Sequence, residues 1–376
     1  MTSDVVSAED TELLRSSVRD AFGELSRPSD VRRLMATATG WDHDVWSRLA
    51  GELGLPGLML SATHGGAGFS RAELAVVMEE AGAALLCAPL FATAALAVPL
   101  LLACADEDAL SRFGPDIAAG RLTATVALAE DDGRWSVDEL RTTARRAGGG
   151  WVVDGVKNYV VDGATAGLVL VVAASDAGPA VFAVGAGASG LRREQLVTLD
   201  QTRKQARLTF ERTPAVAVGP AAAAEAIDRS SDVSRALLAA EQTGGAQHCL
   251  DLTVEYAKTR IQFARPIGSF QAVKQRVAEM LIQVESARSA AYAAAAADID
   301  DLACIARIAA ITCADAYNWV SAQTIQLHGG IGFTWEHDAH LYFKRARASG
   351  QLLGTPGDHV MALAKQLDAE AGWAAP

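Results

Sequence analysis

The chain has 376 residues, half of them hydrophobic, and carries a formal net charge of −12 at pH 7. This length predicts two or three domains with ample hydrophobic core. The acidic balance, with no basic stripe carrying interleaved aromatic residues, argues against a nucleic-acid partner. It leaves room for a small anionic ligand, which needs only a few local cations.

No apolar run approaches the roughly 18 to 20 residues that cross a bilayer, so no membrane span is predicted. The N-terminus is acidic and polar and lacks the basic region and apolar core of a secretory signal. The five cysteines form no CxxC pair and no zinc-like cluster with histidine. They predict a reduced, cytoplasmic protein in which cysteines are ordinary buried residues, and no metal site.

Residues 1 to about 120 predict helices, because apolar residues recur three and four positions apart between Gly and Pro breaks. The segments LLRSSVRDAFGEL and ELAVVMEEAGAALL are examples. From about residue 224 to the end the same texture returns in longer runs, which predict a helical bundle. These runs are ALLAAEQTGGAQHCLDLTVEYAKTR, FQAVKQRVAEMLIQVESARSAAYAAAAAD and IARIAAITCADAYNWVSAQTIQLHG.

Residues 121 to 223 instead contain short Val-rich segments bounded by Gly, Asp and Pro, which predict strands. No helical pattern alternates with them, so a small antiparallel barrel or sandwich fits better than a parallel Rossmann sheet. The predicted strands are LTATVALAE, WVVDGVKNYVVDG, GLVLVVAAS, AVFAVGAG and ARLTF.

The stretch RIQFARPIGSFQ, residues 260–271, interrupts this second helical region. Pro266 and Gly268 disfavour continuation of the helix, and a new helix is predicted to start at Phe270. Arg260 beside an exposed Phe263 suits a phosphate next to a flat heterocycle, because Arg offers a fork of donors and Phe a stacking face. A tight corner between helices, with Arg260 solvated, explains the same residues equally well.

The second unusual stretch is TIQLHGGIGFTWEHD, residues 324–338, in which paired glycines end a long helix. Gly329 and Gly330 would let a flat ligand approach the backbone, with Gln326 one turn earlier to hydrogen-bond it. A simple helix C-cap followed by a flexible turn is the equal alternative.

Together the two stretches resemble the acyl-CoA dehydrogenase family, through R-x-x-F-x-x-P-I-x-x-F-Q followed about fifty residues later by Q-x-x-G-G-x-G-F. The similarity spans nearly the whole chain, and HGGIGFTWEHDAHLYFKRA is similar to an actinobacterial-type branch. The resemblance implies an α+β fold. Its parts would be an N-terminal helical domain (1–120), a central antiparallel β domain (121–223) and a C-terminal four-helix bundle (224–376).

The resemblance also implies that FAD lies between subunits of an oligomer. Arg260 would bind the FAD pyrophosphate. Phe263, Phe270 and Gln271 would lie beside it, and Gln326, Gly329 and Gly330 would contact the adenine end of an FAD held mainly by a neighbouring subunit.

The β domain departs from the family pattern. The Thr-Glu-Pro stretch that faces the flavin in the family corresponds here to Leu128-Ala129-Glu130-Asp131, and the aromatic-Ile-Thr stretch to Tyr159-Val160-Val161. Two hydroxyls are lost, each worth about 0.5–1.5 kcal/mol as a hydrogen bond, so weaker flavin binding is expected. Leu128, Tyr159 and Thr355 are the remaining cofactor-side candidates.

For the substrate, the stretch from Asp232 to Arg235 aligns with a helix start that contacts acyl-CoA in the family. Asp232 would accept from the pantetheine amides, and Arg235 would hold the thioester end. The plainer alternative is a helix N-cap at Asp232 and a solvated helix residue at Arg235.

The catalytic base also departs from the family pattern. α-Proton abstraction needs a carboxylate in an apolar site. The two family positions hold Leu353 and Ser234, neither of which can serve. Glu241, two helical turns beyond Ser234 and offset by roughly 10 Å, is the candidate; pairing with Arg235 or with a partner chain is the alternative. Glu130 and Asp131 are remote candidates.

Three functions remain open at this point. The first is an FAD-dependent acyl-CoA dehydrogenase that passes electrons to an electron-transfer flavoprotein, as a homotetramer or as a heterotetramer with a related subunit. The second is a non-catalytic structural subunit of such a heteromer, which the missing base favours. The third is an oxygen-using acyl-CoA oxidase. The retained Arg260, Gln271 and Gln326 favour the enzyme.

Overall fold

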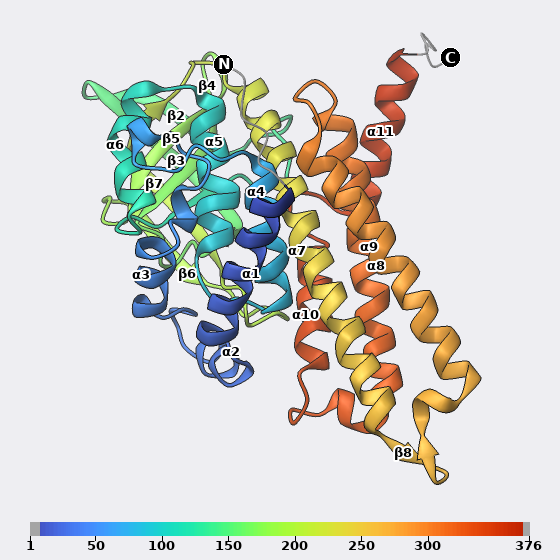
Figure 1. Ribbon diagram of the computed structural model, residues 1–376. Coiled ribbons are helices and arrows are strands. Elements are labelled where there is room, and N and C mark those ends of the chain that lie inside the picture. The colour runs from blue at the N-terminus through green and yellow to red at the C-terminus, as the bar shows by residue number, and fades with distance from the viewer. Residues whose placement is uncertain (1–7, 371–376) are drawn as a thin grey trace. The chain divides into compact units, whose positions relative to one another are not determined.

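The structure, a computed structural model, describes residues 8–370. Contacts divide the described chain into two compact units. The helical unit comprises residues 8–28, Ala75–Leu86 and 235–370, and the barrel unit comprises Ser29–Leu74 and Cys87–Ser234. The order of elements, helices followed by strands followed by helices, is that predicted (Figure 1).

The helical unit is built on long helices whose small residues permit close packing. A Cβ added at Gly244 would lie 1.7 Å from the carbonyl oxygen of Glu79, and one at Gly82 would lie 1.9 Å from that of Glu241. The backbones of α4 and α7 therefore touch where they cross. The helices are α1 (Ala8–Leu25), α4 (Arg71–Ala83), α7 (Ala224–Thr259), α8 (Gln271–Ala296), α9 (Leu302–His328), α10 (Ala339–Ser349) and α11 (Pro356–Glu370), with the 3-10 turns η4 (Ile267–Ser269) and η5 (Gly329–Phe333).

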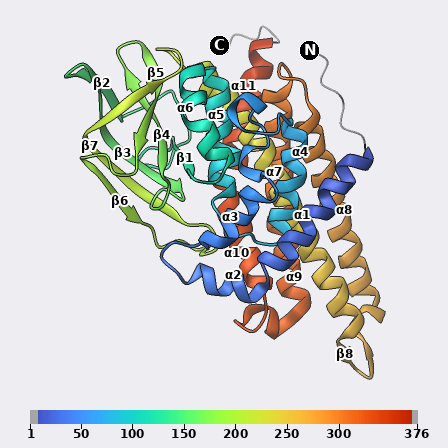
Figure 2. The ribbon, with the colours of Figure 1, turned by 60° about the vertical axis from the view of Figure 1, so that its left-hand side comes forward.

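The barrel unit carries seven strands, and its short helices all precede them in the chain (Figure 2). Its core is formed mainly by valines and alanines, with Phe182, Leu208 and Phe210 among them. The helices are α2 (Pro28–Met35), α3 (His43–Gly51), η1 (Leu55–Gly57), η2 (Ala62–His64), the π-helix η3 (Phe91–Ala97), α5 (Val98–Cys104) and α6 (Glu107–Ala118). The strands are β1 (Ala124–Ala127), β2 (Thr143–Ala147), β3 (Gly150–Val161), β4 (Leu168–Ser175), β5 (Gly178–Gly185), β6 (Leu191–Gln195) and β7 (Gln205–Val218).

Strand pairing closes a ring in the order β4-β2-β3-β7-β5 and back to β4, with β1 and β6 attached at its side. The predicted small barrel is therefore present, but it is not purely antiparallel. β1 pairs with β4 in parallel, from Ala124 opposite Leu168 to Ala127 opposite Val171, and β2 meets β4 in parallel at Thr143 and Ala174. The four residues of β1 are all buried, as is usual for parallel strands covered on both faces.

Two strands, β2 and β6, were not predicted from the sequence. Their sequences, TARRA and LRREQ, are rich in arginine and partly exposed, so they lack the Val-rich signature used to find the others. Across the part of the chain that the structure describes, no helix is long and apolar enough to span a bilayer.

Candidate active site and cofactor-binding segments

The break between α7 and α8 is a tight hairpin. α7 ends at Thr259, and the two-residue strands β8 (Ile261–Gln262) and β9 (Arg265–Pro266) then pair across Phe263 and Ala264. These two residues have φ angles of +52° and +60°. Positive φ at both central positions defines a type I′ turn, which normally uses Asn and Gly, so Phe and Ala are strained there. Such strain is found disproportionately at functional sites.

The side chains of this hairpin are presented to solvent. Phe263 is 86% exposed, and Arg260, the residue just before β8, is exposed and has no side-chain partner among residues 8–370. The Phe270 ring meets that of Phe263 edge-on with centroids 6.0 Å apart, and the Arg265 guanidinium lies 4.0 Å above it. This corner of the molecule therefore presents cationic and aromatic side chains that a ligand could contact. Gln271 begins α8 and is also exposed.

The end of α9 provides a second open surface. Gln326 is exposed on its last turn, and Gly329 and Gly330 are exposed as well. A Cβ added to either glycine would meet nothing within 4 Å. Gly329 also caps the helix, since its N–H donates to the Gln326 carbonyl oxygen. The cap predicted from the sequence and an open approach to the backbone are thus both present.

In the barrel unit, the residues aligned with the family's flavin-facing stretches differ in exposure. Leu128 and Val161 are 4% and 1% exposed, whereas Tyr159 is 41% exposed. Tyr159 also has a φ of +54°, an unusual backbone conformation for an aromatic residue. In this segment the exposed ring of Tyr159, rather than Leu128, offers a surface to a ligand.

The structure corrects the helix start expected at Asp232. α7 begins at Ala224, so Asp232 lies inside the helix and is not its N-cap. The residues before it, 224–231, are already helical. Asp232 and Arg235 are 6% and 7% exposed, so Arg235 is not a solvated residue either. Ser234 donates to the carbonyl oxygens of Ala95 and Ser230 at 2.7 and 2.8 Å.

The segment Leu353–Gly354–Thr355 lies before α11 and contacts Arg235. The Arg235 Nε donates to the Leu353 carbonyl oxygen at 3.2 Å, and Leu353 has a φ of +60°. The hydroxyl of Thr355 donates to Asp358 at 2.7 Å and accepts from its N–H, which makes a capping box for α11. The polar groups of Thr355 are therefore occupied by helix capping.

A buried histidine lies beneath this segment. His359 is 2% exposed, and a Cβ added at Gly354 would lie 2.8 Å from its Cε1 atom. Burial, reinforced by the positive charges of Arg235 and Arg307, lowers the pKa of His359 to about 4. His359 is thus neutral at pH 7.

Glu241 lies on the buried side of α7, 3% exposed, and pairs with Arg345 of α10 at 2.8 Å. Arg345 is itself 2% exposed. The sequence indicated a charged partner for Glu241 but did not identify Arg345, which lies 104 residues away. The sequence signal that could have identified this partner is a basic residue on the apolar side of α10.

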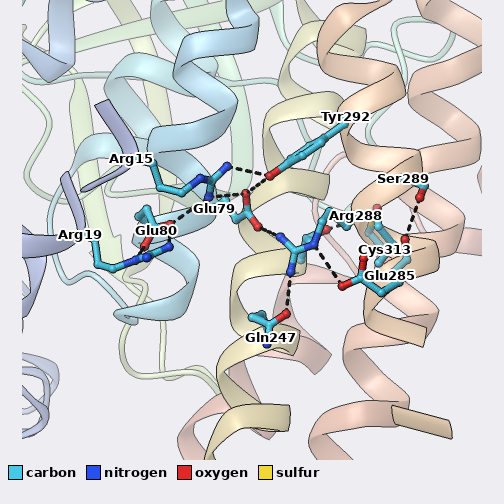
Figure 3. Close-up of polar contacts among 12 residues, drawn as sticks. Arg15, Arg19, Glu79, Glu80, Gln247, Glu285, Arg288, Ser289, Tyr292 and Cys313 are labelled. Atoms are coloured by element: carbon cyan, nitrogen blue, oxygen red, sulfur yellow. Dashed lines mark hydrogen bonds and ion pairs between the residues drawn. The ribbon is translucent and has the colours of Figure 1, made fainter. Parts of the chain in front are cut away.

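A larger cluster of buried charge joins α1, α4, α7 and α8 (Figure 3). The Glu79 carboxylate accepts from Arg15 and from the Tyr292 hydroxyl, both at 2.8 Å, and from Arg288. Arg288 also donates to Gln247 of α7 at 2.6 Å. Each charge has a counter-charge, so the cluster fastens helices together and leaves no carboxylate free to act as a base.

All three parts of the chain match acyl-CoA dehydrogenase models: the N-terminal domain over residues 8–121, the middle domain over 125–213 and the C-terminal domain over 224–367. The chain belongs to the acyl-CoA dehydrogenase family. Members of this family are FAD-dependent oxidoreductases of lipid β-oxidation, so the resemblance seen in the sequence is confirmed, as is the fold class.

Similar proteins include acyl-CoA dehydrogenase IpdE2 of Mycobacterium tuberculosis, 36% identical over 98% of this chain and 99% of that protein. Among solved structures, a variant of the Tcur3481-Tcur3483 steroid ACAD has a TM-score of 0.87 and 31% identity, and covers 97% of this chain and 99% of that one. The ChsE4-ChsE5 complex from Mycobacterium tuberculosis also gives 0.87, with 27% identity and the same coverage.

The residues of this acyl-CoA dehydrogenase fit an FAD cofactor in part. The exposed cation of Arg260 and the open backbone of Gly329 and Gly330 suit a dinucleotide, since a phosphate needs a donor fork and a flat ring needs close approach. The barrel segment offers the Tyr159 ring, but its aligned hydroxyl positions are occupied by Ala129 and Val161.

Proposed function

We propose that this chain is a subunit of an FAD-dependent acyl-CoA dehydrogenase that desaturates the α,β bond of an acyl-CoA thioester. Bound FAD supplies the hydride acceptor, and an electron-transfer flavoprotein takes the electrons onward. The observation that carries the proposal is the strained, exposed hairpin beside a partnerless Arg260. Neither the strain nor the free cation serves the fold, and both suit a dinucleotide phosphate.

In this proposal each exposed segment has its own part of the cofactor. Arg260 neutralises the pyrophosphate, with the hairpin aromatic rings and Gln271 beside it. Gln326 and the two open glycines receive the adenine end, and Tyr159 and the Leu128 segment lie at the flavin end. Thr355 would lie beside the flavin end, while its hydroxyl and its N–H cap α11.

The substrate assignments concern α7. Asp232 would accept from the pantetheine amides, and Arg235 would fix the thioester end through the Leu353 segment, whose carbonyl oxygen it already contacts. The relative described as a steroid ACAD supports a polycyclic acyl group as the substrate class. Both solved relatives named above are described by two chain names, which supports an oligomer in which this chain pairs with a related subunit.

The base of the reaction is assigned to Glu241, the acidic residue on the apolar side of α7. A specific observation favours the second candidate function, a non-catalytic subunit: the Glu241 carboxylate is buried against Arg345 at 2.8 Å. Such a pair fixes the direction of the carboxylate and occupies it with a buried partner. Because Leu353 and Ser234 occupy the family positions for the base, the partner subunit would then supply it.

Anaerobic titration with acyl-CoA tests the proposal. Protein purified alone, and protein purified together with a co-encoded relative, is mixed with acyl-CoA thioesters, including steroid-derived ones, and flavin absorbance is followed. Bleaching by the chain alone supports the enzyme. Bleaching only in the two-chain complex supports a heteromer, in which loss of bleaching in Glu241→Gln supports the enzyme and unchanged bleaching supports the non-catalytic subunit. Flavin that no acyl-CoA reduces in either preparation would contradict the proposed function.

A further inference from the structure

Strand β3 is irregular at Tyr159, between Lys157 and Val160. Lys157 pairs with Leu208 of β7 and Val160 with Ala206, so three steps along β3 match two along β7. One extra residue is therefore inserted as a β-bulge, and Tyr159 takes its positive φ there. Bulges of this kind re-aim a side chain, and backbone strain persists only where the surroundings over-determine it.

A buried lysine, Lys157, lies directly before the bulge and helps to hold it in place. Lys157 is 0% exposed, and its Nζ donates to Glu130 Oε1 at 2.6 Å and to the Leu128 carbonyl oxygen at 2.9 Å. The next N–H, that of Asn158, donates to the Ala129 carbonyl oxygen at 3.0 Å. Three successive contacts thus tie the start of the bulge to residues 128–130.

Glu130 anchors the other end of this arrangement. It is 4% exposed and, besides Lys157, accepts from the N–H groups of Arg141 and Thr142 at 3.2 Å and from the Thr142 hydroxyl at 3.0 Å. Its two oxygens therefore have four donors, which fix the carboxylate in direction. This geometry suits an anchor and does not suit the catalytic base that the sequence left open at Glu130.

The bulged tyrosine is aimed by the same contacts. Its N–H donates to the Asn158 Oδ1 at 3.1 Å, and its ring packs on the Gly133 turn, where an added Cβ would lie 3.0 Å from Cε2. Gly133 in turn donates to the Glu130 carbonyl oxygen at 2.9 Å. The exposed ring of Tyr159 is thus held against residues 128–131, of which 128–130 are buried, and a buried ion pair joins the two segments.

We propose that the Glu130–Lys157 pair is a positioning device that holds Tyr159 and residues 128–131 in register with the flavin. It rests on the proposed function, because it takes FAD as the ligand of this surface. With Ala129 and Val161 in place of the two hydroxyls, flavin contact here depends on backbone groups and one ring. Their placement then sets the affinity and the environment of the flavin.

The test uses the FAD-loaded protein in its purified assembly and compares Lys157→Met with Lys204→Met. Lys204 lies in the same unit but donates to the Met35 carbonyl oxygen at 2.6 Å, so its loss controls for general destabilisation. Hydrogen exchange at the Asn158 and Gly133 amides reports the surface. The visible flavin band and the FAD dissociation constant report the ligand.

For Lys157→Met we expect lost protection at both amides, a shifted flavin band and a dissociation constant raised about tenfold or more. Lys204→Met should lower thermal stability and leave the flavin band and the dissociation constant at the wild-type values. Thr142→Val, which removes one donor to Glu130, should act like Lys157→Met but more weakly, and it decides the matter if Lys157→Met fails to fold.

Lost amide protection with an unchanged flavin band and FAD affinity would overturn the positioning role, since the pair would then be structural only. Unchanged amide protection in a folded variant would overturn it as well. Failure of the proposed function looks different: the wild type itself would take up no FAD in any assembly, and this role would fall with it.

Discussion

The two surfaces assigned to FAD are constructed in opposite ways. In the helical unit, Arg260 and Phe263 project from a strained hairpin and are exposed. In the barrel unit, the Tyr159 ring, which we propose faces the flavin, lies two residues beyond Lys157 of a buried pair, Lys157 and Glu130. The helical surface keeps the family's side chains and can be tested by removing them. The barrel surface lacks two side-chain hydroxyls and keeps its backbone conformation. It can therefore be tested only by changing the buried residues that support it.

The largest effect is expected at Glu241, in the buried part of the helical unit. Glu241→Gln removes the carboxylate that pairs with buried Arg345 at 2.8 Å, which should cost about 3–5 kcal/mol of unfolding free energy. If Glu241 is also the base, flavin reduction by acyl-CoA should fall by roughly two to four orders of magnitude at unchanged flavin content. Thermal unfolding and anaerobic stopped-flow absorbance measure the two quantities separately.

Arg345→Met is the matched control for Glu241→Gln. It breaks the same ion pair but leaves the carboxylate in place. Equal reduction rates per bound flavin in the wild type and in Glu241→Gln would remove Glu241 from catalysis and assign it to packing. A rate lost in Glu241→Gln but kept in Arg345→Met would establish it as the base.

The exposed hairpin should respond in binding rather than in folding. Arg260→Ala removes a charge-assisted phosphate contact worth about 1.5–3 kcal/mol, so flavin occupancy should fall while the thermal midpoint stays near that of the wild type. The flavin-to-protein absorbance ratio measures this. Lys258→Ala is the control, because that nearby cation already pairs with Glu255 at 2.6 Å. An equal flavin-to-protein ratio in Arg260→Ala and wild type would show that the hairpin serves only as a corner between helices.

The Glu79 cluster should show the reverse pattern, a loss of folding without a loss of binding. Glu79→Gln weakens contacts to Arg15 and Arg288, and we expect a loss of about 1.5–3 kcal/mol in the stability of the helical unit. Flavin occupancy at a temperature well below the midpoint should not change. Reduced flavin occupancy in the folded variant would show that this cluster also affects cofactor binding, and would contradict the proposed difference from Arg260.

The last effect concerns pH. The folded-state pKa of His359 is about 4, below its ordinary value of 6.5, so between these pH values the unfolded chain binds the additional proton. Stability from this group is therefore full above pH 6.5 and is lost as pH falls toward 4. His359→Gln should flatten the stability profile in that window relative to wild type, as measured by urea unfolding. Parallel profiles would contradict the neutral buried histidine.

The sequence predicted long helices and the break at Pro266 and Gly268 correctly, because helical periodicity and helix breakers are local signals. It did not predict the hairpin turn, since Phe263 and Ala264 are residues that a type I′ turn normally excludes. It placed the start of the second helical region correctly at about residue 224, but the helix start expected at Asp232 was wrong, because α7 already begins at Ala224.

Other features depend on contacts between distant segments. The parallel pairing of β1 with β4 bypasses β2 and β3, which a search for hairpins does not anticipate. The partner of Glu241 is 104 residues away, and the anchor of Lys157 is 27 residues away. Amino-acid type identified Glu241 as unusual in apolar surroundings, but Lys157 was not singled out from the sequence. Only the fold decides which of them pair with one another and which stay exposed to a ligand.

The central claim is that this chain binds FAD through exposed residues that need a second chain to complete the site. The most direct measurement is size-exclusion chromatography with light scattering, with absorbance recorded at protein and flavin wavelengths, on the chain alone and with a co-encoded relative. The account predicts that flavin elutes with a species of two or more chains and is lost from Arg260→Ala. A monomer that carries stoichiometric FAD, or an oligomer whose flavin content is unaffected by Arg260→Ala, would contradict it.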